Sequence, residues 1–92
     1  DIYYYKTSSN SKEVDFVVCD KSVPVLLIQV AYDIDNHKTF KRETSALIAS
    51  SDKLKCNNLL LLSYTESNNI IINEKTIKIK SIIEWLLESP EL

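Results

Sequence analysis

Two carboxylates near the start of the chain have a spacing that suits metal chemistry. Glu13 and Asp15 are separated only by Val14, so a strand would place both on one face, about 6–7 Å apart. Carboxylate oxygens at this spacing can help to bind a hard divalent cation such as Mg²⁺. Alternatively, Glu13 lies at a solvated strand end, and then only Asp15 has a role to explain.

Gln29 is the polar exception in an otherwise apolar stretch, residues 24–32. A buried amide without hydrogen-bond partners costs about 1–3 kcal/mol, so we expect this side chain to be bonded. If the strands that carry Asp15 and Gln29 are neighbours, the two residues lie side by side. They form either a structural hydrogen bond between amide and carboxylate or part of a ligand site.

A small basic cluster follows, made up of His37, Lys38, Lys41 and Arg42. It predicts either a phosphate-binding patch or, more simply, a solvated helix face. The formal net charge of −2 does not favour a general electrostatic grip on nucleic acid.

Composition excludes several kinds of site. The chain has no glycine, which excludes the glycine-rich phosphate loops of P-loop and dinucleotide-binding proteins. Cys19, Cys56 and His37 are too few for the usual structural zinc site, and the two cysteines predict small, buried, reduced side chains in a cytoplasmic protein. The longest apolar run, residues 23–30, is too short to cross a bilayer. We expect a single domain over residues 1–92 that is a fragment of a longer protein.

Hydrophobic periodicity predicts the elements that position these residues. Residues 2–6, 13–19 and 24–32 have strand patterns, and the polar turns between them predict an antiparallel meander. Apolar and small residues at helical spacing predict a helix over 38–54. The candidate caps of this helix are Asp35, Asn36 or Thr39 at its start and Asn57 or Asn58 as its left-handed stop.

The second half of the chain predicts three more strands and a short helix. The unbroken leucine run 59–62 suits a strand that is covered on both faces and runs parallel to the strand before the helix. Residues 70–72 and 77–79 predict a hairpin around 73–75, with a longer turn or mild strain because Glu74 stands where glycine is favoured. Residues 81–87 predict a docking helix that Pro90 stops.

Several short segments, taken in order, resemble a known family. The stretches 13–17 and 27–30 are similar to the Asp…Glu-x-Lys core of restriction-endonuclease-like, PD-(D/E)XK, domains. The whole series is more similar to a C-terminal domain of unknown function that follows the AAA+-type ATPase module of bacterial and archaeal ATP-binding proteins. The further matching segments are Tyr3-Tyr4-Tyr5-Lys6-Thr7, Gln29-Val30-Ala31-Tyr32-Asp33, Thr39, Arg42-Glu43, Ala46-Leu47 and Ile83-Glu84-Trp85-Leu86-Leu87.

The resemblance implies an α/β fold, a mixed sheet flanked by helices in the order β-β-β-α-β-β-β-α, without the first covering helix of the family. In active members of the superfamily, the Asp and Glu hold magnesium, and the Lys polarises the attacking water. Asp15 matches the Asp, whereas Gln29 stands in place of the Glu and Ala31 in place of the Lys. A neutral amide oxygen is a weaker ligand for a hard cation, and alanine brings no charge.

Three interpretations follow from this degenerate core. In the first, the domain is a non-catalytic accessory module without a cofactor, in which Asp15 and Gln29 are vestigial. In the second, it is a weak Mg²⁺-dependent nuclease with Glu13, Asp15 and a relocated Glu43 as ligands. In the third, it is a nucleic-acid-binding remnant that uses Lys38, Lys41 and Arg42.

The same resemblance implies partners. We expect the domain to act with an ATPase module that precedes it in the same chain. Without the family's first helix, an apolar sheet face would be exposed, and this predicts self-association. Glu43, in the simplest interpretation, pairs with surface lysines.

Overall fold

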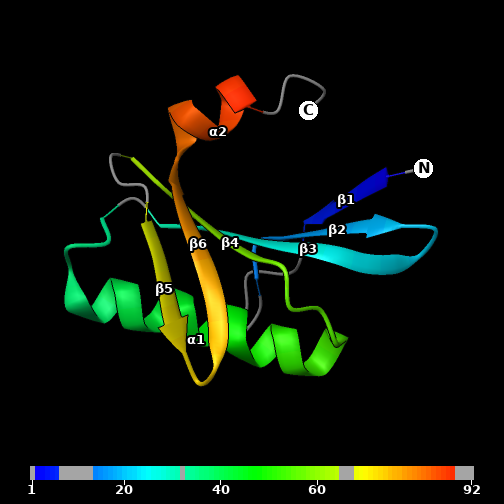
Figure 1. Ribbon diagram of the computed structural model, residues 1–92, viewed down its shortest axis with the longest axis horizontal. Helices are drawn as coiled ribbons and strands as arrows, with labels where there is room; N and C mark the ends of the chain where they lie inside the picture. The colour runs from blue at the N-terminus through cyan, green and yellow to red at the C-terminus, as the bar shows by residue number, and fades with distance from the viewer. Residues whose placement is uncertain (1, 7–13, 32, 65–67, 89–92) are drawn as a thin grey trace.

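The computed structural model describes residues 14–31, 33–64 and 68–88, together with the backbone of 2–6. It is an α/β structure with one mixed six-stranded sheet in the order β1-β2-β3-β4-β6-β5 and one helix on each face (Figure 1). The elements are β1 (Ile2–Lys6), β2 (Phe16–Asp20), β3 (Val23–Val30), α1 (His37–Leu54), β4 (Leu59–Ser63), β5 (Asn68–Ile72), β6 (Lys75–Ser81) and α2 (Ile82–Glu88). The predicted order of strands and helices is confirmed.

The first three strands form the predicted antiparallel meander. Lys21 and Ser22, which join β2 to β3, both have positive φ, as a two-residue type I′ turn requires. The prediction that a strand begins at residue 13 is wrong, because Asp15 lies in a bend and β2 begins at Phe16. For the same reason Val14 is buried on the same side of the sheet as Val17, whereas strict alternation along one strand would place residues 14 and 17 on opposite faces.

Helix α1 ends at Leu54 as predicted and begins one residue before the predicted start, but its left-handed stop comes earlier than predicted. The Oδ1 atom of Asn36 accepts a hydrogen bond from the Thr39 N–H at 3.1 Å, which makes Asn36 the N-cap. The left-handed residue at the other end is Lys55, with φ 54°, and not Asn57 or Asn58. The chain turns there because the next residue, Cys56, is buried in the core.

Strand β4 lies at the centre of the sheet and is covered on both faces, as predicted. Leu59 and Leu61 pack toward α1, and Leu60 and Leu62 pack on the opposite face with Trp85 of α2. The strand runs parallel to β3 and to β6. Full burial of each leucine contributes about 1.5–3 kcal/mol, so this strand anchors both layers.

The hairpin of β5 and β6 is tighter than predicted. Ile72 pairs with Lys75, which leaves only Asn73 and Glu74 in the turn, with φ of 51° and 65°. A non-glycine residue in this region is strained, which agrees with the strain expected at Glu74. Ile70 and Ile72 pack toward α1.

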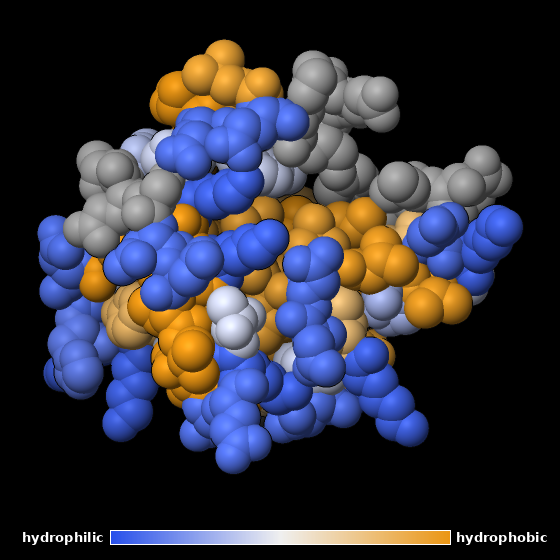
Figure 2. Space-filling model, in the orientation of Figure 1, coloured by the Kyte–Doolittle hydropathy of each residue, from blue (hydrophilic) through white to orange (hydrophobic). Residues whose placement is uncertain are grey.

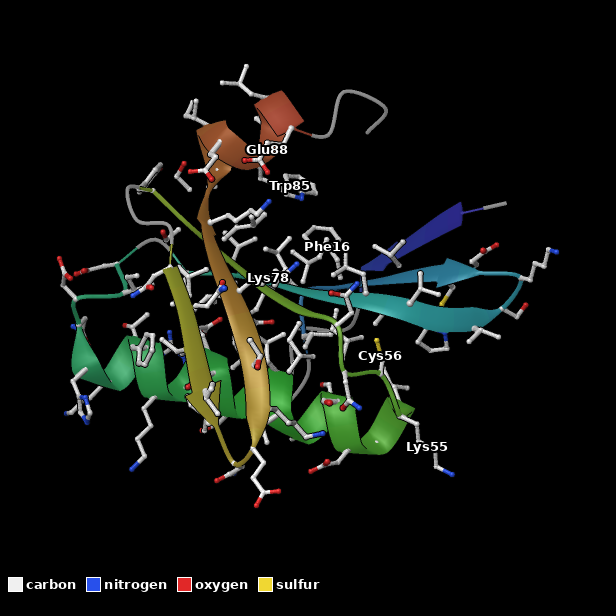
Figure 3. All side chains as sticks on the ribbon, in the orientation of Figure 1. Phe16, Lys55, Cys56, Lys78, Trp85 and Glu88 are labelled. Atoms are coloured by element: carbon white, nitrogen blue, oxygen red, sulfur yellow. The ribbon has the colours of Figure 1, made fainter. Side chains whose placement is uncertain are left out.

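Helix α2 docks on the sheet with only part of its apolar surface. Ile82 and Trp85 pack against the outer face of the sheet, near Phe16 (Figure 3). Ile83, Leu86 and Leu87, by contrast, are exposed, Leu87 by 78%. Neither of the described helices is long and apolar enough to cross a membrane.

Candidate functional site

Gln29 is the centre of a polar cluster inside the layer between the sheet and α1. Its side chain is buried, with 5% of its surface exposed, because β3 directs it to the same face as Leu27 and Ala31. Its Oε1 atom accepts a hydrogen bond from the backbone N–H of Asp15 at 2.8 Å, and its Nε2 atom donates to the Glu43 carboxylate. Only the amide oxygen can accept from an N–H and only the amide nitrogen can donate to a carboxylate, so the two partners fix the orientation of the amide.

Asp15 lies beside Gln29, as predicted, but the two side chains do not bond to each other. The Oδ2 atom of Asp15 accepts a hydrogen bond from the backbone N–H of Val30 at 3.0 Å. Asp15 and the stretch Gln29–Val30 are therefore tied together at two points. These bonds continue the attachment of the chain to β3 at the bend that precedes β2.

Glu43 reaches this cluster from α1. Its Oε2 atom accepts from Gln29, and its Oε1 atom accepts from the Nε atom of Arg42 at 3.0 Å. The expectation that Glu43 pairs with surface lysines is therefore wrong. Its position in the second turn of α1 directs the carboxylate under the sheet, where Gln29 is the available donor.

The arrangement is a chain of satisfied hydrogen bonds from β2 through β3 to α1. Among the described residues, no buried side-chain nitrogen or oxygen lacks a partner. Nor do any three His, Cys, Asp or Glu side chains among them lie close enough together to hold a metal ion. Glu13, the other acidic candidate, lies outside the described residues. Ala31 is buried beside the cluster and supplies no charge.

The basic candidates lie on a different surface. His37, Lys38, Lys41 and Arg42 are all exposed on the first turns of α1. Of these, Arg42 is the residue that contacts the cluster, through Glu43. Both cysteines, Cys19 and Cys56, are free and buried, as predicted.

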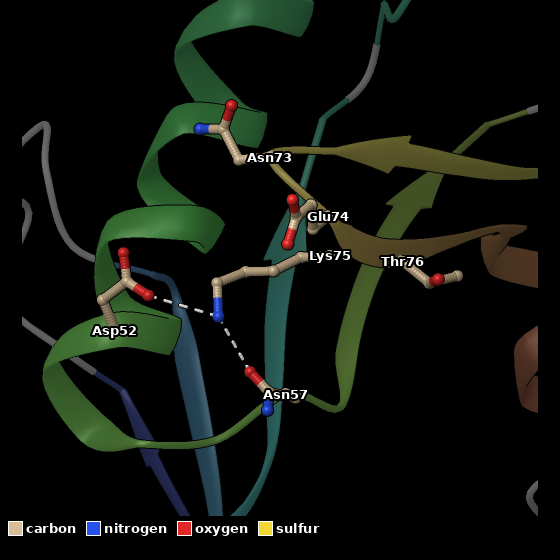
Figure 4. A pocket seen from close by; sticks show the side chains of 6 residues that line it. All are labelled: Asp52, Asn57, Asn73, Glu74, Lys75 and Thr76. Carbon is tan, nitrogen blue, oxygen red and sulfur yellow. Dashed lines mark hydrogen bonds and ion pairs between the residues drawn. The ribbon is translucent and has the colours of Figure 1, made fainter.

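The structure also forms a hollow that sequence reasoning missed. It has a volume of about 540 Å³ and lies between the end of α1 and the β5–β6 turn (Figure 4). Lys75 projects into it and donates to Asn57 Oδ1 at 2.9 Å, with Asp52 Oδ1 at 3.2 Å. Asn57 also accepts from the hydroxyl of Ser51 at 3.0 Å. No local spacing signals this group, because its members come from α1, from the connection between α1 and β4, and from β6.

No family model, curated protein or solved structure matches this chain.

Proposed function

We propose that this chain is a non-catalytic, restriction-endonuclease-like accessory domain of an AAA+-type ATP-binding protein. The observation that carries the proposal is the bonding of Gln29, whose amide joins the backbone of Asp15 to the carboxylate of Glu43. The residue at the position of the catalytic Glu thus has a structural role that explains its burial. The mixed sheet with one helix on each face supports the superfamily assignment.

The same bonds bear on metal chemistry. A cation bound at Gln29 Oε1 would have to compete with the Asp15 N–H for that oxygen. Glu43 Oε2 is likewise engaged by the amide of Gln29. The neutral amide and the methyl group of Ala31 are also weak substitutes for a carboxylate and an ammonium group.

An accessory domain needs a surface for its partner, and α2 offers one. Ile83, Leu86 and Leu87 form an exposed apolar stripe at i, i+3 and i+4. Figure 2 shows apolar side chains on α2 and across the adjoining centre of the same face. Exposed apolar patches of this kind mark docking sites, and the partner we propose is the ATPase module of the same cytoplasmic protein.

A metal titration tests the proposal. Nuclear magnetic resonance spectra of the wild type are expected to show no site-specific shift of the Asp15, Gln29 and Val30 amides at millimolar Mg²⁺. The matched variant Gln29→Glu/Ala31→Lys restores the acid-x-lysine pattern, and its spectra are expected to respond. Mg²⁺-dependent shifts at these amides in the wild type, together with cleavage of DNA, would instead establish the nuclease alternative, which the approach of Glu43 to Gln29 favours.

A nucleic-acid-binding remnant is the other alternative. It is favoured by the exposure of His37, Lys38 and Lys41 at the N-terminal end of α1, where the first turn has no acidic residue and the helix dipole is positive. This function predicts affinity for DNA or RNA that falls steeply with salt. Unchanged binding by a Lys38→Ala/Lys41→Ala variant would reject it.

A further inference from the structure

Strand β5 is an edge of the sheet. It pairs with β6 on one side, and within the part of the chain that the structure describes no strand lies on its other side (Figure 1). An open edge presents backbone N–H and C=O groups that can pair with another chain. Natural edge strands usually carry lysine, proline or a bulge that prevents this pairing, whereas residues 68–72 read Asn-Asn-Ile-Ile-Ile.

The tight turn decides which backbone groups face outward. Because only Asn73 and Glu74 lie in the turn, Ile72 and Lys75 form the first hydrogen-bonded pair of the hairpin. Hydrogen-bonded and non-hydrogen-bonded pairs alternate along an antiparallel ladder. The N–H and C=O groups of Asn69 and Ile71 therefore point away from β6, toward the open edge.

The side chains of the strand complement a second copy of themselves. Residues 69–73 read Asn-Ile-Ile-Ile-Asn, which is the same in both directions about Ile71. An antiparallel pair of two β5 strands centred on Ile71 places like opposite like, with Ile70, Ile71 and Ile72 at the paired positions and no charged residue among them. Ile71 is 73% exposed on the outer face, so pairing with its own copy would shield apolar surface there.

The inner face fits the same register. Ile70 and Ile72 are half-buried at the margin of the core beneath the sheet. In the centred register Ile70 lies opposite Ile72 of the second copy, so the margins of the two cores would meet. Cross-strand contacts between side chains on one face are the unit that stabilises a strand pair.

We propose that β5 is a homodimerisation strand, which pairs antiparallel with β5 of a second copy about a two-fold axis at Ile71. The two sheets then form one continuous sheet, and the dimer is closed because each β5 has no further free edge. This edge differs from the apolar sheet face for which self-association was predicted, and from the exposed stripe of α2. The proposal does not depend on the accessory function.

The association is expected to be weak. A single strand pair buries less than the roughly 1,200 Å² of a standard interface, so the dimer should form only at high protein concentration. One edge group is also engaged locally, since Asn68 Oδ1 accepts from the Asn69 N–H at 2.8 Å. Release of that N–H should strengthen the pairing, so Asn68→Ala is expected to tighten the dimer.

Charge exchange at the two-fold axis tests the proposal. Ile71→Lys places like charges directly opposite each other, and Ile71→Glu does the same with the opposite sign. We expect each variant alone to dimerise at least about tenfold more weakly than the wild type, a loss of about 1.4 kcal/mol. An equimolar mixture is expected to regain the dimer, because Lys then faces Glu. Sedimentation velocity measures dimer formation by the wild type, by each variant and by the mixture, and circular dichroism confirms that each variant is folded.

Thr76→Lys is the matched control. Thr76 pairs with Ile71 inside the hairpin, so a lysine at position 76 adds the same charge to the same face of the sheet. Position 76 lies on β6, away from the open edge. We expect this variant to dimerise as the wild type does. A wild type that stays monomeric at about 1 mM would overturn the proposal. So would fibres in place of a dimer, an Ile71→Lys variant that dimerises normally, or a mixture that does not reassociate.

Discussion

The side-chain amide of Gln29 donates a hydrogen bond to the carboxylate of Glu43 and thereby joins β3 to α1 inside the molecule. The same amide accepts from the backbone of Asp15, which leads into β2. One side chain therefore connects β3 to α1 and to the bend that precedes β2. Its two partners, Asp15 and Glu43, each lie 14 residues from Gln29 in the sequence. This bonding explains why a polar residue is kept in an apolar strand.

Exchange of the two side chains tests this connection. Gln29→Glu places two carboxylates in contact, and Glu43→Gln places two amides there. We expect each single variant to lower the free energy of unfolding by about 1–3 kcal/mol at pH 7. The double variant Gln29→Glu/Glu43→Gln restores a donor opposite an acceptor, and its stability is expected to return to within about 1 kcal/mol of the wild type.

Urea unfolding of the four proteins measures this coupling as a double-mutant cycle. The loss in Gln29→Glu should also shrink as the pH is lowered, because one of the two acids then binds a proton and becomes a donor. Additive losses in the double variant would show that the amide and the carboxylate do not act as a pair.

Asp15 is predicted to protect one backbone amide. Its carboxylate accepts from the Val30 N–H at 3.0 Å, so Asp15→Ala leaves that group without its partner. We expect a loss of about 1–2 kcal/mol and faster hydrogen exchange at Val30, whereas Asp15→Asn keeps an acceptor oxygen and most of the protection. The control Asp35→Ala removes an exposed carboxylate of the same charge. Equal exchange rates at Val30 in Asp15→Ala and the wild type would contradict the assignment.

The β5–β6 turn is predicted to store strain that glycine can relieve. Glu74 has φ 65°, a conformation that costs a residue with a side chain about 1–2 kcal/mol. We expect Glu74→Gly to raise the free energy of unfolding by about 0.5–1 kcal/mol. This is less than the full strain, because the greater conformational entropy of glycine in the unfolded chain offsets part of the gain. Glu74→Gln removes the charge and keeps the strain, so thermal unfolding of this variant should match the wild type.

The contact of α2 with β6 is predicted to weaken in acid. The Lys80 ammonium donates a hydrogen bond to the Glu88 carboxylate and holds the pKa of that carboxyl below its ordinary value of about 4.5. A carboxyl whose pKa is lowered in the folded state stabilises that state at pH values above its ordinary pKa. This contribution is lost as the pH falls through the folded pKa. The fluorescence of Trp85, the only tryptophan, should therefore change below about pH 4.5.

Glu88→Gln isolates this contribution from the other carboxyls. The variant cannot ionise at position 88, so its fluorescence titration should lack the step that the wild type shows in this acid range. Superimposable titrations of the two proteins would show that the ion pair does not hold α2 in solution.

Much of the fold is predictable from periodicity. The helix predicted over 38–54, the leucine strand and the β2–β3 and β5–β6 hairpins follow from local patterns of apolar residues, because each element must bury one or both of its faces. The errors occur where a local preference competes with packing. Val14 leaves the alternation at the bend, and Lys55 takes the left-handed conformation because Cys56 must enter the core.

The candidate site divides in the same way. Residue types alone singled out Asp15 and Gln29 as polar residues beside or within apolar strands, since the need of an amide or a carboxylate for hydrogen-bond partners does not depend on the fold. Only the tertiary structure decided that Gln29 bonds to Glu43, that Arg42 shares that carboxylate and that Lys75 meets Asp52 and Asn57. These partners lie on different elements, and their meeting depends on how the helix and strands pack, which local spacing does not encode.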